Sequence, residues 1–247
     1  MRSKAKKAYC FIALLAAAAC MLSGCARISG AIKDAGTKTT DAPLLEPTLS
    51  PTDEPLPTEK TNPVFIFLTG FISEYGRASA GLLDSVFMSG DAELTGLYAA
   101  LAGDEALVSR LFVTVGMLTQ DEGRSTFSGT FTGAYAGSGQ LRHMNSFSYA
   151  FDNGDELVGT LTSGTDLKCA YTADGETIIM TVALTESGYV MRVERGGILG
   201  CAEIAPDGLR YERFAAKDAP DGDMHVFPEV AGTSILTYSG GAAALSE

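Results

Sequence analysis

A long stretch of alternating apolar and polar residues, from residue 125 to residue 214, constrains the fold of this chain more than any other feature. Turn-forming groups rich in Gly, Asn and Asp interrupt the stretch about every ten residues, which is the spacing of short strands joined by hairpins. We therefore predict about eight consecutive antiparallel strands in this stretch. The turn groups are Gly137-Ser138-Gly139, Asp152–Asp155, Ser163–Thr165, Ala173–Gly175, Glu186–Gly188, Gly196-Gly197 and Pro206–Gly208.

Each predicted strand places its apolar residues on one face, as expected when one side of a sheet covers a core and the other side meets water. Because a meander of this length twists and curls, we expect either an open cupped sheet or a closed barrel. The inward-facing sets include Leu157 and Leu161; Leu167 and Tyr171; Ile178, Met180, Val182 and Leu184; and Tyr189, Met191 and Val193.

Residues 63–119 carry apolar residues at intervals of three and four, the period of a helix with one buried face. Three such stripes follow one another, so we predict three helices. Asn62-Pro63 is a suitable start, because proline is favoured at the first helical position. We expect a break near Gly76 and boundaries at Ser89–Asp91 and Gly103-Asp104, with Asp104 as a candidate N-cap.

Together these segments predict one α+β domain. Its three N-terminal helices, within residues 63–119, would pack on the apolar face of a curved antiparallel meander formed by residues 120–240. Ser234–Tyr238 suggests one further strand, and residues 241–247 a Gly/Ala-rich tail.

Residues 25–62 are too poor in large apolar residues to offset the entropy that folding would cost. Five of the nine prolines lie between Pro43 and Pro57, among Thr, Ser, Asp and Glu residues. We therefore expect a disordered, extended tether. A proline-rich partner motif and a glycosylated stalk are the alternatives to a plain spacer.

The N-terminus has the three parts of an export signal. Arg2, Lys4, Lys6 and Lys7 form a positive region, and the apolar run that follows is shorter than the roughly 20 residues of a membrane-spanning helix. Leu22-Ser23-Gly24-Cys25 then resembles the lipobox of bacterial lipoproteins at all four positions. The resemblance implies removal of residues 1–24, diacylglycerol on the Cys25 sulfur, and usually a further acyl group, such as palmitate, on its amine.

Two or three acyl chains give stable anchoring, because each buried methylene contributes about 0.8 kcal/mol. We therefore expect the folded domain in the cell envelope, lipid-anchored to the membrane and outside the cytoplasm. Without residues 1–24 the chain keeps 14 basic and 30 acidic residues, a net charge near −16. Such a surface repels nucleic acid and anionic headgroups, so the Cys25 lipid is the expected membrane contact.

Cys169 and Cys201 remain after lipidation of Cys25, in a compartment that permits disulfides. On the fourth and seventh predicted strands they would lie about 14 Å apart, whereas a disulfide needs Cα atoms within about 7 Å. We expect two separate, half-buried thiols. Lys168 points away from Cys169 in a strand, so that thiol lacks the electropositive neighbour of a reactive cysteine.

The remaining candidates for chemistry are weak. His143 lies on the strand face of Leu141 and Phe147, which indicates packing. His225 follows the acidic loop Asp218–Asp223, which could hold calcium but lacks the spacing of an EF-hand, so a surface turn fits better. Nucleophile-elbow and phosphate-loop motifs are absent from the sequence. We predict no catalytic residue, no metal site and no cofactor.

The sequence thus predicts a non-catalytic binding or interaction module. One version carries a lipid or another apolar ligand inside the cupped sheet, by analogy with lipoprotein carriers built on curved sheets, and an internal cavity of roughly several hundred Å³ would support it. The other contacts an envelope protein through the solvent-facing sheet or an edge strand. A hydrolase would need a histidine to meet a nucleophile in a cleft.

The lipobox interpretation predicts that Cys25→Ser abolishes acylation. Expressed in a bacterium and fed radiolabelled palmitate, the variant is expected to lose the label and to fail to yield the lipid-modified mature form. Cys20→Ser, which changes a cysteine of the apolar run, is the matched control and keeps both. Full labelling of the Cys25→Ser variant would contradict the interpretation.

Overall fold

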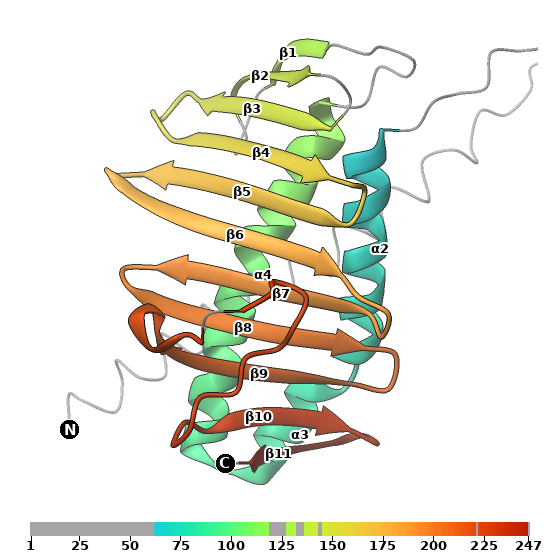
Figure 1. The fold of residues 1–247 in the computed structure, drawn as a ribbon, viewed down its shortest axis with the longest axis vertical. Helices are drawn as coiled ribbons and strands as arrows, with labels where there is room; N and C mark the ends of the chain where they lie inside the picture. The colour runs from blue at the N-terminus through green and yellow to red at the C-terminus, as the bar shows by residue number, and fades with distance from the viewer. Residues whose placement is uncertain (1–61, 119–126, 132–135, 143–144, 221, 247) are drawn as a thin grey trace, which may run out of the picture. The chain divides into compact units, whose positions relative to one another are not determined.

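The computed structural model describes residues 62–118, 127–131, 136–142, 145–220 and 222–246, which belong to the unit Pro55–Glu247. An open antiparallel sheet carries helices on one face, so the prediction of an α+β fold with an open sheet is confirmed (Figure 1). The expectations for the export signal, Cys25, the tether and His143 concern residues outside this described part.

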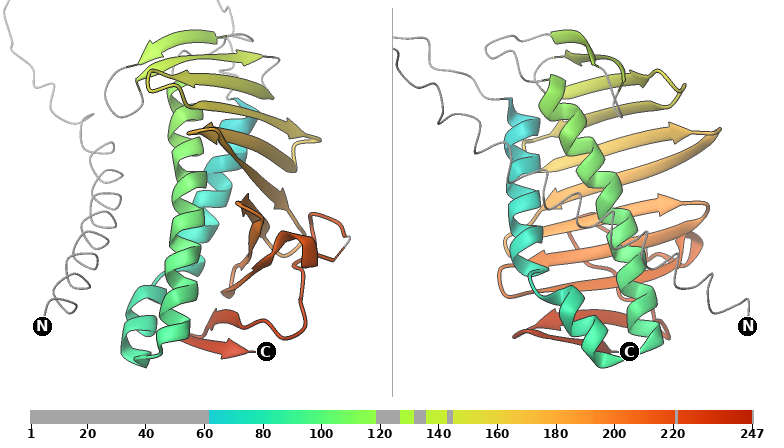
Figure 2. Two further views of the ribbon diagram at one scale, coloured as in Figure 1. Left: turned by 90° about the vertical axis from the view of Figure 1, so that its left-hand side faces the viewer. Right: turned by 180° about the vertical axis from the view of Figure 1, so that it is seen from behind.

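The helical segment forms α2 (Pro63–Ala78), α3 (Leu82–Ser89) and α4 (Ala92–Leu118). The right-hand view of Figure 2, seen from behind, shows α2 and α4 side by side in front of the sheet, where both run across the strands. Asn62 begins α2 as the sequence indicates, because its Oδ1 accepts hydrogen bonds from the backbone N–H groups of Val64 and Phe65 at 2.9 and 3.2 Å.

Eleven strands of the described residues form one sheet in sequence order, so β1 and β11 are its edges and the sheet is not closed. The expected number of about eight was too low. The strands are β1 (Phe127–Phe131), β2 (Gly137–Arg142), β3 (Ser146–Phe151), β4 (Glu156–Thr162), β5 (Asp166–Ala173), β6 (Glu176–Leu184), β7 (Tyr189–Arg195), β8 (Ile198–Ala205), β9 (Gly208–Ala215), β10 (Ile235–Ser239) and β11 (Ala242–Ser246).

One predicted helix boundary was displaced and another was wrong. The break expected near Gly76 comes a few residues later, at residues 79–81, where Gly81 has a φ of 81°, a left-handed conformation that favours glycine. The boundary expected at Gly103-Asp104 does not exist, because α4 continues through both residues. Glycine costs a helix about 1 kcal/mol, and the buried Leu101 and Val108 on either side more than offset that cost.

Two predictions for the ends of the sheet also fail. Gly137-Ser138-Gly139, expected to be a turn, lies within β2. There a Cβ on Gly139 would stand 2.7 Å from Leu118 of α4, so the missing side chain admits the helix. Residues 242–246, expected to be a tail, pair with β10 as β11. The turn Gly240-Gly241, with φ of 56° and 82°, suits the two-residue hairpin that joins them.

The face of the sheet that carries the helices, called the inner face below, holds the core. The inward residues predicted from alternation are buried, apart from Leu184, which is 38 % exposed near the end of β6. Leu68 and Phe71 of α2 and Leu101, Val108 and Leu111 of α4 belong to the same continuous cluster. The apolar face of the meander is therefore covered by helices that cross it.

Polar contacts fix α4 on this face. Tyr211 in β9 donates a hydrogen bond of 2.6 Å to Asp104, so the residue expected to cap a helix instead joins the helix to the sheet. Gly200 makes room, because a Cβ there would collide with the Asp104 carboxylate. Burial raises the pKa of Asp104 despite the bond from Tyr211, which lowers it. Farther along α4, Arg110 donates to the Tyr171 hydroxyl at 2.9 Å.

Shortening a buried side chain of α4 should lower the stability of the fold considerably. Leu101→Ala removes a side chain with no exposed surface and is expected to lower the free energy of unfolding by about 2–5 kcal/mol. Leu184→Ala, the same change at a 38 % exposed position, should cost less than about 1 kcal/mol. Urea titration followed by circular dichroism measures both, and equal losses would contradict the packing described.

Candidate functional site

The outer face of the sheet, opposite the helices, is divided into a covered part and an open part. Residues 216–220 and 222–234, together called the covering segment, leave the end of β9 and cross the outer face of β7–β9 before β10 begins (Figure 1). Phe227 of this segment and Ile235 pack on Val190 and Cys201, which are 1 % and 0 % exposed. A second, smaller apolar cluster therefore lies on the outer face.

Side chains of β7 and β9 hold the covering segment in place. Arg192 donates to the backbone carbonyls of Asp223 and Val226 at 2.9 and 2.8 Å. The guanidinium of Arg210 lies 4.4 Å from the centre of the Phe227 ring and also bonds to Glu229 at 2.5 Å. These contacts use charge-assisted and cation–π attraction to keep an irregular segment against the sheet.

Glu212 of β9 is fully buried beneath the same segment. Its Oε1 accepts hydrogen bonds from the Val230 N–H, at 3.1 Å, and from the Thr233 hydroxyl. A buried carboxylate is costly unless it is hydrogen-bonded. The bonds to Oε1 offset part of the cost of burying Glu212, and they would be lost if the covering segment moved away.

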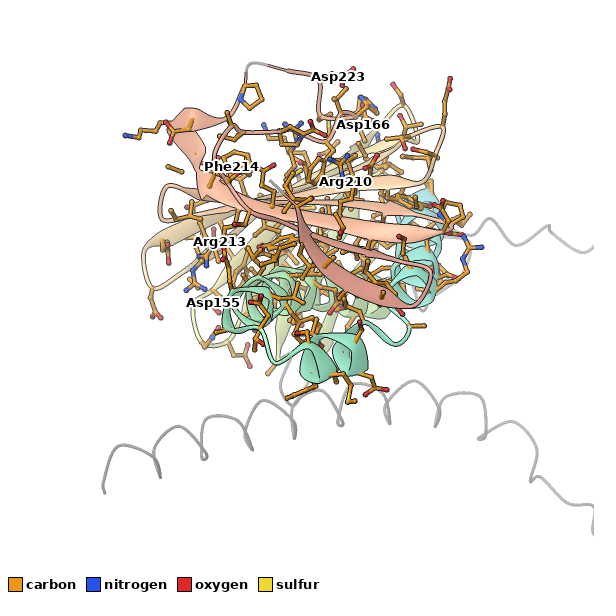
Figure 3. The ribbon with its side chains drawn as sticks, turned by 90° about the horizontal axis from the view of Figure 1, so that it is seen from below. Asp155, Asp166, Arg210, Arg213, Phe214 and Asp223 are labelled. Carbon is orange, nitrogen blue, oxygen red and sulfur yellow. The ribbon has the colours of Figure 1, made fainter. Side chains whose placement is uncertain are left out.

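His225 forms the contact of the covering segment that lies nearest to the open part. Its ring nitrogens lie 2.7 Å from Asp166 Oδ1 in β5 and 2.5 Å from Asp223 Oδ1. Hydrogen bonds to these two carboxylates raise the pKa of His225, with Asp223 the larger cause. Figure 3 shows Asp166, Arg210 and Asp223 together on the side of the sheet away from the helices.

The open part of the outer face holds a groove of about 630 Å³ over β2–β6. Its outward-facing residues are Arg142, Ser146, Ser148, Val158, Thr160, Lys168, Ala170 and Ile179, and Phe147, Gly159 and Cys169 lie between them in the strands. The pairing of the strands arranges the outward-facing residues in two neighbouring rows that run across the sheet.

The first row, called the polar row, pairs Arg142, Ser146, Thr160 and Lys168 across four strands. The second, called the apolar row, pairs Ser148, Val158, Ala170 and Ile179. Because same-face residues of one strand are two positions apart, the rows lie about 7 Å from each other. The groove thus offers cations and hydroxyls along one side and aliphatic groups along the other.

The two cations of the groove have no acidic partner among the described residues. The Lys168 side chain forms no hydrogen bond or ion pair with the described part of the chain, and the Arg142 guanidinium donates there only to the neutral amide oxygen of Gln140, at 2.8 and 3.3 Å. By contrast, Arg195 and Arg210 are paired with glutamates. Although the chain has 30 acidic residues, none of those that the structure describes pairs with either of these two positive charges.

Cys169 and Cys201 lie three strands apart on opposite faces of the sheet, and both thiols are free, as predicted. They are fully buried rather than half-buried, at 2 % and 0 % exposed. Burial raises the pKa of both, that of Cys201 to about 12. Lys168 is exposed on the outer face and Cys169 faces the core, as expected.

The acidic loop that was considered for calcium has another role. Asp223 bonds to His225, and no three His, Cys, Asp or Glu side chains among the described residues gather into a possible metal site.

Sequence reasoning missed the groove and the covering segment. The available signal was an interruption of alternation, because Leu157-Val158 and Ile178-Ile179-Met180 place apolar residues on the outer face as well.

Comparisons with protein-family models, with curated proteins and with solved structures give no significant match. None of the helices within the described ranges has the length and apolar character needed to cross a membrane. The proposals below therefore depend on the geometry of this chain and on its sequence.

The contacts of His225 predict that attachment of the covering segment depends on pH. Because the pKa of His225 is raised in the folded state, its protonated ring stabilises the attachment fully below the unfolded-state pKa of 6.5. This stabilisation is lost as the pH rises through the folded-state pKa. Hydrogen exchange of residues 222–234, corrected for intrinsic rates, should therefore show less protection at about pH 8.5 than at about pH 6.

His225→Gln should reduce protection at the lower pH and flatten this dependence. His143→Gln, which changes the other histidine of the chain, is the matched control and should leave it unchanged. A covering segment equally protected at both values in the unaltered protein would contradict the assignment.

Proposed function

We propose that this chain is a non-catalytic, membrane-anchored extracytoplasmic lipoprotein whose folded domain is a binding module, and that it binds through the outer-face groove. The observation that carries the proposal is the pairing of a hollow of about 630 Å³ with two cations that lack an acidic partner among the described residues. Pockets for small ligands commonly have volumes of about 300–1,000 Å³.

The composition of the groove supports binding rather than catalysis. Among the described residues its lining contains hydroxyls, aliphatic groups and two cations, and no histidine or carboxylate that could act as a general base near neutral pH. The hydrolase alternative needs His143 or His225 near a nucleophile. His143 lies outside the described residues, and both ring nitrogens of His225 contact carboxylates. Cys169 lines the groove from within the strand, but its thiol faces the core.

The alternative carrier, which would hold a lipid between the helices and the cupped sheet, receives less support. The side chains of that space, including Tyr149, Tyr211 and Phe71, are among the largest fully buried ones and belong to one continuous cluster. A ligand there would have to separate α2 and α4 from the sheet. The groove needs no such rearrangement, because Val158 and Lys168 are already exposed.

Site-specific photocrosslinking in living cells tests the proposal on the full, lipid-anchored chain. Benzoylphenylalanine at Thr160 places the reactive group in the groove, and the same residue at Glu186 places it in the exposed turn between β6 and β7. We expect a defined adduct from position 160 that Lys168→Glu removes, and none from position 186. Lys217→Glu makes the same charge change at an exposed position outside the groove and should preserve the adduct.

Adducts of equal yield from both positions, or an adduct from position 160 that survives Lys168→Glu, would contradict binding through the groove. Native mass spectrometry of protein purified without detergent tests the carrier alternative. A bound mass that is lost on denaturation yet unaffected by Lys168→Glu would favour the carrier.

A further inference from the structure

We infer that the groove binds a small, free anionic amphiphile, whose anionic group meets Arg142 and Lys168 and whose apolar part lies on Val158, Ala170 and Ile179. This inference rests on the proposed function and adds the chemical class of the ligand.

The anionic half of the inference follows from the polar row. A guanidinium and an ammonium at its two ends are separated by Ser146 and Thr160, whose hydroxyls can donate to an oxyanion. Asp166, two positions from Lys168 on the same face, already accepts a bond from His225. The groove therefore provides two positive charges and two hydroxyls, and none of the described residues that line it carries a carboxylate to compete with an anion.

The apolar half follows from the neighbouring row. Val158 is 47 % exposed and Ile179 is partly exposed, although both occupy strand positions that usually carry polar residues in this sheet. The covering segment buries similar outward-facing aliphatic residues, such as Val190, over β7–β9. Over β4–β6 the aliphatic residues line an open hollow, where burying them against a ligand would be favourable by about 25 cal/mol per Å².

The position of the groove and the charge of the chain favour a small amphiphile over a strand of another protein or an anionic membrane surface. A strand of another protein would pair at β1 or β11, whereas the groove lies over β2–β6. An anionic membrane surface would be repelled by a chain whose net charge is −12 before processing. A single amphiphile can enter the hollow and match both rows, because its charged and apolar parts need to be separated by only about 7 Å.

Calorimetric titration of the full mature chain carrying Cys25→Ser, which needs no detergent, tests the inference. The probes are dodecyl phosphate, dodecan-1-ol and inorganic phosphate, with both dodecyl compounds kept below their aggregation limits. We expect one molecule of dodecyl phosphate to bind at least about tenfold more tightly than either of the other probes, since each lacks one of the two matching parts.

Variants separate the contributions of the two rows. Lys168→Glu should weaken dodecyl phosphate at least about tenfold with little effect on dodecan-1-ol, and Lys217→Glu should change neither. Val158→Ser should weaken both dodecyl compounds, while Met88→Ser, at an 87 % exposed position on α3, should change neither. Circular dichroism confirms that each variant is folded, as expected for changes at exposed side chains.

Absence of dodecyl phosphate binding, equal affinity for the phosphate and the alcohol, or equal effects of Lys168→Glu and Lys217→Glu would overturn the inference. These outcomes are distinguishable from failure of the proposed function. If the crosslink at position 160 still depends on Lys168 when no amphiphile binds, the groove is a binding site for another partner, such as an acidic protein segment. Lys168-dependent binding to phosphatidylglycerol vesicles alone would instead identify the membrane.

Discussion

Burial of one apolar face of an eleven-stranded sheet by two helices that cross its strands is the constraint on which this structure depends. Within the described ranges every strand pairs only with its neighbours in sequence, so the sheet contributes a wide apolar surface that no second sheet of this part of the chain covers. The helices α2 and α4 cover it. Asp104 and Arg110 on α4 reach the tyrosine hydroxyls of β9 and β5, which fixes the position of the helix along the sheet.

The same constraint supports the proposal that the outer face is the binding face. Once the inner face is filled, a ligand can be held without rearrangement only on the other side. That side is apolar enough over β7–β9 to require the covering segment, which is attached through Arg192, Arg210, Glu212 and His225. Over β4–β6 the apolar row remains open beside two cations, and this difference between neighbouring strands of one sheet supports the proposed binding site.

Much of the fold could be predicted because the signals were local. Alternation identified the inward residues of β4–β7, and Asn62-Pro63 identified the start of α2. The helix boundary predicted at Gly103-Asp104 was wrong because a capping signal is local, whereas Asp104 bonds to Tyr211, 107 residues away. Gly137 and Gly139 looked like a turn because a sequence does not show that a glycine within a strand can make room for its neighbours, here Tyr149 at both positions and also Leu118 of α4 at Gly139.

The candidate site was less predictable for the same reason. Lys168 was placed correctly on the solvent face, but its significance depends on Arg142 and Val158, which strand pairing brings into neighbouring rows. The covering segment lacks regular periodicity, and its contact between His225 and Asp166 joins residues 59 positions apart. Only the register of the whole sheet reveals that one part of the outer face is covered and another is hollow.

The central claim is that the outer face is open over β4–β6 and closed over β7–β9, and cysteine accessibility on the membrane-anchored chain tests it most directly. Ile179→Cys and Val190→Cys place a thiol in the groove and beneath the covering segment, against a background in which Cys169 and Cys201 are buried. The account predicts rapid maleimide labelling at position 179 and protection at position 190. Equal labelling at the two positions, or protection at 179, would contradict it.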